Sequence, residues 1–435
     1  MARRQPTDAA TAAGPARGTY DDGTRRTEIL RTAESLIASS GLRTSLQEIA
    51  DAAGILPGSL YHHFESKEAI LVELLRRYYA DLERIGAIAR DKLDQPGSRP
   101  VSEAIIELGS AIARCAVEHR AALQMSFYDA PTANRELVEL LRHPPTAVQD
   151  AMLQTLRAGR WSGYIRAEVD LPTLADRICQ SMMHVGLDVI RHTAAADQAA
   201  MLLCRIMLHG LASRPYSDKE LDRSAAFAAA EEAIKTWPEE TESAANDKAA
   251  HVRAVARAEF GRKGYEVTTI RDIASAAGLG TGTVYRLIGS KDELLASIME
   301  SFGKKAGGGF VSVLRANATP IEKLDALTWV NINALDQFPD EWKIQLAWMR
   351  QSPPDTPNPG LLFTTRLRQL KSMLSEGIRS GNIRIDTPSI EMLARCVMDV
   401  IWMPENIVRA QGKSAALINA RDTVIRGVAD RNARD

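Results

Sequence analysis

The sequence lacks the patterns that mark an enzyme, a metal site, a secreted protein or a membrane protein. Its four cysteines (Cys115, Cys179, Cys204 and Cys396) have neither zinc-site nor disulfide spacing, so we expect reduced, buried thiols of a cytosolic protein. No 18-residue apolar run or signal peptide occurs, so export and membrane spanning are not expected. HExxH, GxSxG and phosphate-binding glycine loops are also missing, and we expect no catalytic activity, no metal and no cofactor.

The overall charge excludes a strongly basic protein. With a net charge of −1 over 435 residues, no global field indicates a nucleic-acid partner, so any DNA contact must come from local patches. The hydrophobic share of 45% and the charged share of 25% are ordinary for a globular protein. The length predicts two to four domains.

One stretch, residues 45–67, indicates two short helices joined by a tight turn. Ser45 and Glu48 form a capping box that opens the first helix, and Gly54 ends it because glycine adopts a left-handed conformation without penalty. Pro57 then takes the first position of a second helix that runs to about Phe64. Such a pair is a helix-turn-helix, whose second helix enters the major groove of DNA.

The same stretch resembles the signature of TetR-family transcriptional regulators. The residues that carry the resemblance follow the pattern G-x-x-x-G-x-L-Y-x-H-F-x-S-K-E: Gly54, Gly58, Leu60, Tyr61, His63, Phe64, Ser66, Lys67 and Glu68. The resemblance implies an all-α fold in which a long helix, here from Ser66 to about Gln95, joins the head to a helical sensor domain. It also implies that the last two sensor helices form a four-helix bundle with a second subunit.

The motif occurs twice in the chain. Thr269 to Gly278 repeats Ser45 to Gly54, and further matches lie 224 positions after their first copies: Gly282, Val284, Tyr285, Ser290, Lys291, Asp292 and Leu295. The sensor motif Gly159 to Arg166 recurs 218 positions later, at Gly377 to Arg384. A repeat this long is a whole subunit rather than a solenoid unit. We therefore expect two TetR-like subunits fused in one chain as a pseudo-two-fold dimer.

The expected domain boundaries follow from the two copies. Residues 1–23, rich in Ala, Gly, Thr and Pro, are expected to form a disordered arm. A capping box at Ser217 and Glu220 predicts an extra helix to about Trp237 between the copies. The division is 24–84 for the first helix-turn-helix domain, 85–213 for the first sensor, 214–245 for the linker, 246–306 for the second helix-turn-helix domain and 307–435 for the second sensor.

The two heads differ, so we expect an asymmetric operator rather than the palindrome that identical subunits bind. Between residues 248 and 291 the second head has eight Lys or Arg against three acidic residues, whereas the charges of the first head balance. Leu287 and Ile288 stand where the first head has His63 and Phe64. This departure leaves the base-reading geometry of the second head open.

Candidate DNA contacts are the hydroxyl, glycine, aromatic and basic residues of the two motifs. Hydroxyls can hydrogen-bond to base edges, whereas tyrosine, lysine and arginine can hold phosphates, which position the protein without specifying sequence. In the first head they are Thr44, Ser45, Pro57, Gly58, Ser59, Tyr61, His62, His63 and Lys67, and in the second Thr268, Thr269, Thr281, Gly282, Thr283, Tyr285, Arg286 and Lys291.

Bulky apolar residues of the two sensors are candidates for an effector site, although such stripes are more often core. The family resemblance implies apolar pockets between the sensor helices, and we expect a small hydrophobic effector of lipid, steroid or acyl-CoA type. The candidates are Phe127, Tyr128, Trp161, Met183, Trp342, Trp348 and Trp402.

Three consecutive glycines, Gly307 to Gly309, fall within the second connecting helix. They cost about 3 kcal/mol of helix propensity relative to alanine, so we expect a hinge there, with close packing against a neighbouring helix as the alternative.

Together these features predict a cytoplasmic, nucleoid-associated repressor that binds double-stranded operator DNA as an intrachain pseudo-dimer and is released by its effector. No membrane association is expected. The alternative is a ligand- or partner-binding protein whose second head has lost DNA binding. An enzyme is the least supported class, because no nucleophile–base pair is visible.

Overall fold

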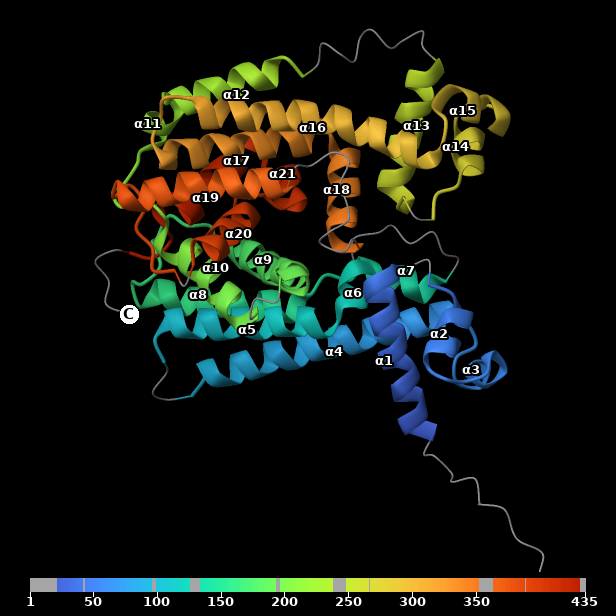
Figure 1. Ribbon diagram of the computed structural model, residues 1–435. Coiled ribbons are helices and arrows are strands. Elements are labelled where there is room, and N and C mark those ends of the chain that lie inside the picture. Colours follow the sequence, from blue (N-terminus) through green and yellow to red (C-terminus); the bar gives the residue numbers. More distant parts are fainter. Residues whose placement is uncertain are drawn as a thin grey trace, which may run out of the picture.

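The computed structural model describes residues 22–41, 44–95, 99–125, 134–192, 196–237, 248–265, 267–351, 363–387 and 389–430, with side chains except at 22–23, 186–192, 346–351 and 363–364. These residues form helices, and the two β-bridges among them are isolated pairs, so the all-α class is confirmed. Two helical layers, one from each half of the chain, lie against each other, and each has a small head at the same end (Figure 1). The predicted arm falls outside the described residues up to residue 21.

Local capping signals set the helices of the first copy. Ser66, for example, begins the long connecting helix by accepting a hydrogen bond from the Ala69 N–H (3.2 Å). The head consists of α1 (Asp22–Ser40), α2 (Leu46–Ala52) and α3 (Pro57–His63), and α4 (Lys67–Leu93) connects it to the sensor. The sensor helices are α5 (Val101–Glu118), α6 (Arg120–Met125), α7 (Arg135–Arg142), α8 (Thr146–Trp161), α9 (Leu171–His192) and α10 (Ala196–His209). None of the described helices of the chain has the length and apolar character needed to cross a bilayer.

The linker between the copies holds two helices where we predicted one. The capping box at Ser217 and Glu220 is present and begins α11 (Asp218–Asp222). Ser224 then acts as a second N-cap, since its hydroxyl accepts a hydrogen bond from the Phe227 N–H (3.0 Å), and α12 (Ala225–Lys235) follows. A second cap so soon after the first divides the helical segment.

The second copy repeats this order with one break. Its head is α13 (Lys248–Lys263), α14 (Ile270–Ala276) and α15 (Thr281–Ile288), and α16 (Lys291–Arg315) is its connector. The sensor helices are α17 (Pro320–Gln337), α18 (Pro339–Gln351), α19 (Phe363–Arg379), α20 (Ile390–Val400), α21 (Glu405–Gln411), α22 (Lys413–Ala420) and the π-helical turn η3 (Arg421–Arg426). Pro404 separates α20 from α21, because proline interrupts a helix that the first copy continues as α9.

The predicted hinge at Gly307 to Gly309 is wrong. Helix α16 is continuous from Lys291 to Arg315. The alternative, close packing, fits: a Cβ added at the buried Gly309 would lie 3.1 Å from the Val330 side chain and 3.6 Å from Trp237. Tertiary contacts that only a glycine admits offset the unfavourable propensity.

The two copies exchange their chain ends in the same way. The segment after α10 pairs with the turn before α20, and the segment after η3 pairs with the turn before α9. The backbone hydrogen bonds are Ser213 N to Asn382 O (3.0 Å), Arg384 N to Leu211 O (2.9 Å), Asp430 N to Tyr164 O (2.7 Å) and Arg166 N to Val428 O (3.0 Å). Helices α9 and α10 contact α20, and α10 also contacts η3. The segment after the last helix of each copy, its tail, thus pairs with the other copy. This reciprocal arrangement is the predicted pseudo-two-fold dimer.

The exchanged tails meet at two glycines that end the last helix of each copy. Gly210 (φ +70°) and Gly427 (φ +79°) both have left-handed backbones. A Cβ added at Gly210 would lie 2.4 Å from the Ile425 carbonyl oxygen, and one at Gly427 would lie 2.2 Å from the His209 carbonyl carbon. Both the φ angle and the close approach therefore require glycine.

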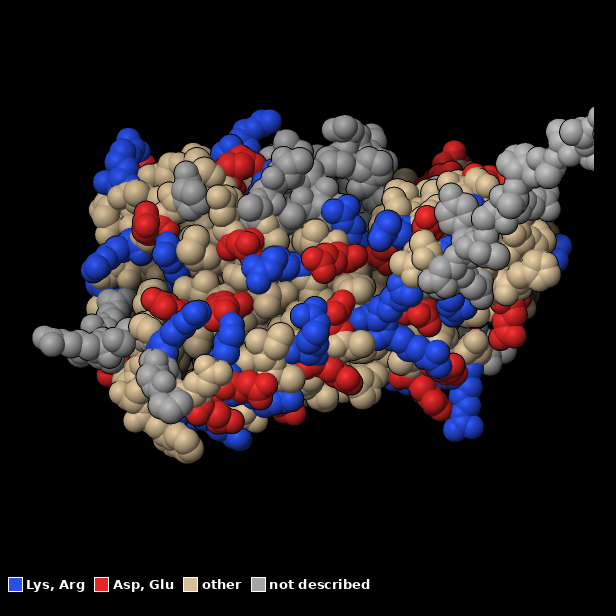
Figure 2. All heavy atoms as spheres, turned by 90° about the horizontal axis from the view of Figure 1, so that it is seen from below, with Lys and Arg blue, Asp and Glu red and all other residues tan. Residues whose placement is uncertain are grey.

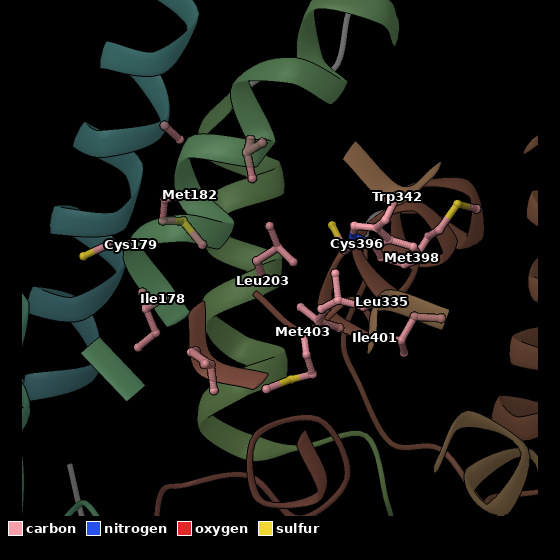
Figure 3. Packing of buried hydrophobic residues seen from close by; sticks show 14 of the residues in the cluster. Ile178, Cys179, Met182, Leu203, Leu335, Trp342, Cys396, Met398, Ile401 and Met403 are labelled. Carbon is pink, nitrogen blue, oxygen red and sulfur yellow. The ribbon is translucent and has the colours of Figure 1, made fainter. Parts of the chain in front are cut away.

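Apolar side chains from both copies fill the space beside this crossing. Figure 3 shows Leu203 of α10 and Met403 of the second copy within the same packed core. One buried cation also joins the copies: Arg177 of α9 is 1% exposed and donates to the Val400 carbonyl (2.7 Å) and to Asn419 Oδ1 (2.8 Å). A buried guanidinium needs such acceptors, so removing them would leave an unpaired charge.

Replacing Gly210 with alanine is expected to destabilise the protein much more than the same change at Gly163. Both glycines have left-handed φ angles, which cost alanine about 1 to 2 kcal/mol. Only Gly210 adds a backbone clash, because nothing lies within 4 Å of a Cβ at Gly163, and overpacking costs a further ~1–3 kcal/mol. Urea unfolding of both variants measures the difference, and equal losses would contradict a sterically closed crossing.

Candidate nucleic-acid interface

Both heads build a helix-turn-helix from the same local signals. Ser45 and Glu48 form the capping box of α2, with the Ser45 N–H donating to Glu48 Oε2 (2.7 Å). Thr269 and Asp272 form that of α14 (2.8 Å). The turns that follow contain Gly54 (φ +65°) and Gly278 (φ +66°). The local geometry predicted for residues 45–64 is therefore present, and its second occurrence is present at 269–288.

In the first head, α3 presents its polar side outward. Leu60 and Phe64 are buried against the head, whereas Tyr61 is 56% exposed and Gly58, Ser59 and His62 are exposed. Pro57 and His63 are half-buried. Arg26 of α1 donates to the His63 carbonyl oxygen (2.7 Å) and lies over the Phe64 ring (4.2 Å), so it braces the end of α3.

In the second head, α15 likewise buries its inner side and exposes a tyrosine and its neighbours, with different residues. Val284 is buried, Tyr285 is 55% exposed, and Thr281, Gly282 and Arg286 are exposed, with Thr283 half-buried. Leu287 and Ile288 pack against the core as partly buried residues. Gly289 (φ +70°) then ends the helix, so the departure from the first head leaves α15 complete.

Two predicted DNA contacts face inward instead. Thr44 and Thr268 are 2% and 1% exposed, and their hydroxyls donate to the carbonyls of Gly41 (2.9 Å) and Gly264 (2.7 Å). These hydroxyls fasten the end of the first head helix to the start of the second. The neighbouring caps Ser45 and Thr269 are exposed.

The two predicted phosphate-binding lysines lie at the starts of the connecting helices. Lys67 is half-buried, and burial lowers the pKa of its ammonium group. Lys291 donates to the carbonyls of Tyr265 (2.8 Å) and Thr268 (3.0 Å) and lies over the Tyr265 ring (4.2 Å). Lys291 therefore holds the turn of its own head together.

Comparison with known proteins accords with this geometry. The model of bacterial regulatory proteins of the tetR family matches residues 29–74 and 252–298, one segment in each head. The transcriptional repressor KstR2 of Rhodococcus jostii (strain RHA1) is 36% identical over 203 residues, which cover 46% of this chain and 97% of that protein. The chain belongs to the TetR family.

Other similar TetR proteins cover smaller parts or are more distant. KstR2 of Mycobacterium tuberculosis (strain ATCC 25618 / H37Rv) is 51% identical over 71 residues, which are 16% of this chain and 34% of that protein. The solved structure of the ketosteroid transcriptional regulator KstR2 of M. tuberculosis has 28% identity and a TM-score of 0.33, covering 40% of this chain and 89% of that one.

The two TetR heads are held to their sensors by polar contacts of different kinds. The half-buried Glu34 of α1 accepts a hydrogen bond from the Ala121 N–H at the start of α6 (2.6 Å), and partial burial raises the pKa of this carboxyl group. At the equivalent site of the second copy, Arg257 of α13 donates to Glu341 of α18 (3.2 Å). Helix α18 also contacts α1, so it touches both heads.

Among the predicted effector residues whose side chains the structure describes, Trp342 and Trp402 lie together, whereas Trp161 and Met183 belong to the first sensor. Trp161 is 88% exposed, so it lines no enclosed site. Met183 packs half-buried against the core, while the rings of Trp342 and Trp402 contact each other at a tilt in the second sensor, with centroids 4.7 Å apart. Phe127, Tyr128 and the Trp348 side chain lie outside the described part of the chain.

A groove of about 450 Å³, not predicted from the sequence, lies between α4 and α5 of the first sensor. Its floor is made of short or aliphatic side chains, and its rim is charged. No aromatic or methionine stripe marks it, which is why the search for bulky residues passed over it. The floor residues are Ile85, Ile88, Ala89, Leu93, Leu108 and Ala111.

Two threonines of the second head are expected to give opposite results on substitution. Thr268→Ala removes a buried hydrogen bond and is expected to lower stability by about 1 to 3 kcal/mol. Thr283→Ala changes the outer side of α15 and is expected to leave the melting temperature within a degree or two while altering DNA preference. Thermal unfolding and a competition gel shift measure both variants, and a specificity change confined to Thr268→Ala would reverse the assignment.

Proposed function

We propose that this protein is a single-chain repressor that binds an asymmetric operator with its two unlike heads and is released by a small hydrophobic effector. It would act in the cytoplasm, on the nucleoid. The Rhodococcus relative is named a transcriptional repressor, and the match covers 97% of that protein. This similarity supports repression rather than activation as the activity of the chain.

The arrangement of the heads supports a shared DNA target. Helices α3 and α15 lie at the same end of the molecule, one in each layer (Figure 1). Dimeric helix-turn-helix proteins place two such helices in successive major grooves, about 34 Å apart. Here the exposed residues differ, with His62 on α3 where α15 has Arg286. Arginine can bind guanine through two hydrogen bonds, so the half-sites would differ in base preference.

The single observation that carries the proposal is a pair of glycines with no packing role. Gly58 and Gly282 lie within α3 and α15, where glycine costs up to about 1 kcal/mol relative to alanine. Nothing in the chain lies within 4 Å of a Cβ added at either position. Since the fold does not need them, a close approach of DNA backbone accounts for both.

Release by an effector would operate through the head–sensor contacts. A ligand lowers operator affinity only by as much as it prefers a sensor conformation that the DNA-bound protein lacks. Glu34 with α6 and Arg257 with α18 are the contacts through which a sensor change would reach each head. The solved relative is titled a ketosteroid regulator, so steroids are the first effector class to test.

Changing Gly58 or Gly282 to alanine is expected to raise stability and weaken operator binding together. The helix gains up to about 1 kcal/mol because the site is open. The new methyl group would stand between the helix and DNA, and affinity is expected to fall at least tenfold. Denaturant unfolding and gel-shift titration measure the two effects. Gly308→Ala, at an open position of α16 with nothing within 4 Å of an added Cβ, serves as the control, and unchanged affinity in both test variants would argue against this interface.

Exchanging the outer residues of one recognition helix tests the asymmetric operator directly. Selection from random DNA is expected to yield a non-palindromic site for the natural chain. Placing the α3 residues on α15 is expected to yield a palindrome of the first half-site, and the reverse exchange a palindrome of the second. The substitutions are Gly280→Leu, Thr281→Pro, Thr283→Ser and Arg286→His on α15, with the reverse changes at Leu56, Pro57, Ser59 and His62 on α3. A palindrome from the natural chain would overturn the proposal.

A further inference from the structure

We propose that the linker helix α12 permanently occupies the effector groove of the second sensor, so that the chain binds one small amphipathic anion, in the equivalent groove of the first. The inference rests on the proposed function, because the anion would be the effector. Its basis is a difference between two pseudo-equivalent grooves, one between α4 and α5 and the other between α16 and α17.

The equivalence follows from the repeat. Positions on α16 lie 224 residues after their counterparts on α4, and α17 begins and ends 219 residues after α5. Four positions that line the first groove are half-exposed, whereas their counterparts are buried. The pairs are Ile85 and Gly309, Ala89 and Val313, Glu107 and Ala326, and Ala111 and Val330.

Helix α12 and the residues after it supply the cover in the second copy. The helix packs against both α16 and α17, and it lies along the outer side of α16 in Figure 1. Trp237 is 2% exposed and reaches Gly309, while Phe227 stacks on Trp329 with ring centroids 5.8 Å apart. Glu231 accepts a hydrogen bond from the indole N–H of Trp329. The occupant of this groove is thus an apolar surface with a carboxylate.

The first groove has no such cover among the described residues. Ile88, on its floor, is 43% exposed, although bulky aliphatic side chains are normally buried. The groove volume of about 450 Å³ lies within the range of small-molecule sites, roughly 300 to 1,000 Å³. Figure 2 shows the face below α4 in Figure 1, where basic and acidic side chains lie beside one another.

Positive charge gathers at one end of the groove. Lys92 Nζ and Arg99 Nη1 both bind the Glu107 carboxylate, at 2.5 and 2.9 Å, so two cations share one anion. The hydrogen bond from Lys92 lowers the pKa of this carboxyl group, which stays ionised. The surplus charge would attract an anionic group, while an apolar body would cover Ile85 and Ile88. This combination defines the ligand class.

The first test uses 8-anilinonaphthalene-1-sulfonate, a small amphipathic anion, in a fluorescence titration of the full chain. One probe is expected to bind per chain. Ala111→Trp fills the floor and is expected to weaken binding at least tenfold, whereas Ala87→Trp, on an exposed position of α4 outside the groove, is expected to bind normally. The double variant Lys92→Ala and Arg99→Ala is expected to weaken binding severalfold, compared with Lys304→Ala and Arg315→Ala on exposed parts of α16.

The second test opens the other groove. Phe227→Ala combined with Trp237→Ala is expected to loosen α12 and raise the stoichiometry from one probe to two, with the helical content of the chain checked by circular dichroism. If this variant does not fold, comparison of Ala111→Trp with Ala87→Trp still shows whether the probe binds in the groove of the first sensor. Two probes on the natural chain, or normal binding by Ala111→Trp, would overturn the inference. The titration contains no DNA, so a result that overturns this inference does not test operator binding. A gel shift that shows no operator binding would in turn contradict the proposed function but not the binding of the probe.

Discussion

The segments that follow the last sensor helix of each copy cross at Gly210 and Gly427, and the rest of the structure depends on this contact. Each tail completes the sensor of the other copy, and a side chain at either glycine would meet backbone atoms at less than 3 Å. Since both copies belong to one polypeptide, this contact forms without a bimolecular step. It also sets the relation of the two layers, so that both heads project from the same end of the molecule (Figure 1).

The two copies differ in the contacts between head and sensor and in the cover of the sensor groove, although they are related by pseudo-two-fold symmetry. The first head is held to its sensor by the half-buried Glu34 carboxylate and the second by an arginine–glutamate pair, and α18 touches both heads. The linker covers a groove in the second sensor that stays open in the first. A homodimer cannot make such differences, because one sequence must serve both subunits. Under the proposed function, fusion would let one copy specialise in sensing while both keep a recognition helix.

Features set by neighbouring residues were predicted correctly. The capping boxes at Ser45 and Thr269 and the left-handed turn glycines depend on contacts within a few residues, and the repeat made each motif visible twice. Predictions failed where distant segments decide. The helix through Gly309 persists because Val330 and Trp237 pack against it, and Trp161, a candidate for the effector site, is exposed. Thr44 and Thr268, candidates for DNA contacts, are an exception, because their hydroxyls donate to carbonyls only three and four residues earlier in the chain.

The sequence by itself determined the helical class, the family, the duplication and the outer residues of both recognition helices, because these follow from spacing and from residues adjacent in the chain. Only the tertiary structure decided how the tails exchange, which of two equivalent grooves stays open and which polar groups join head to sensor. Those features arise from contacts between residues far apart in the chain, as in the pairs Arg177 and Asn419 and Arg166 and Val428. No local pattern records such a contact, since its free energy exists only when the packed copies bring the partners together.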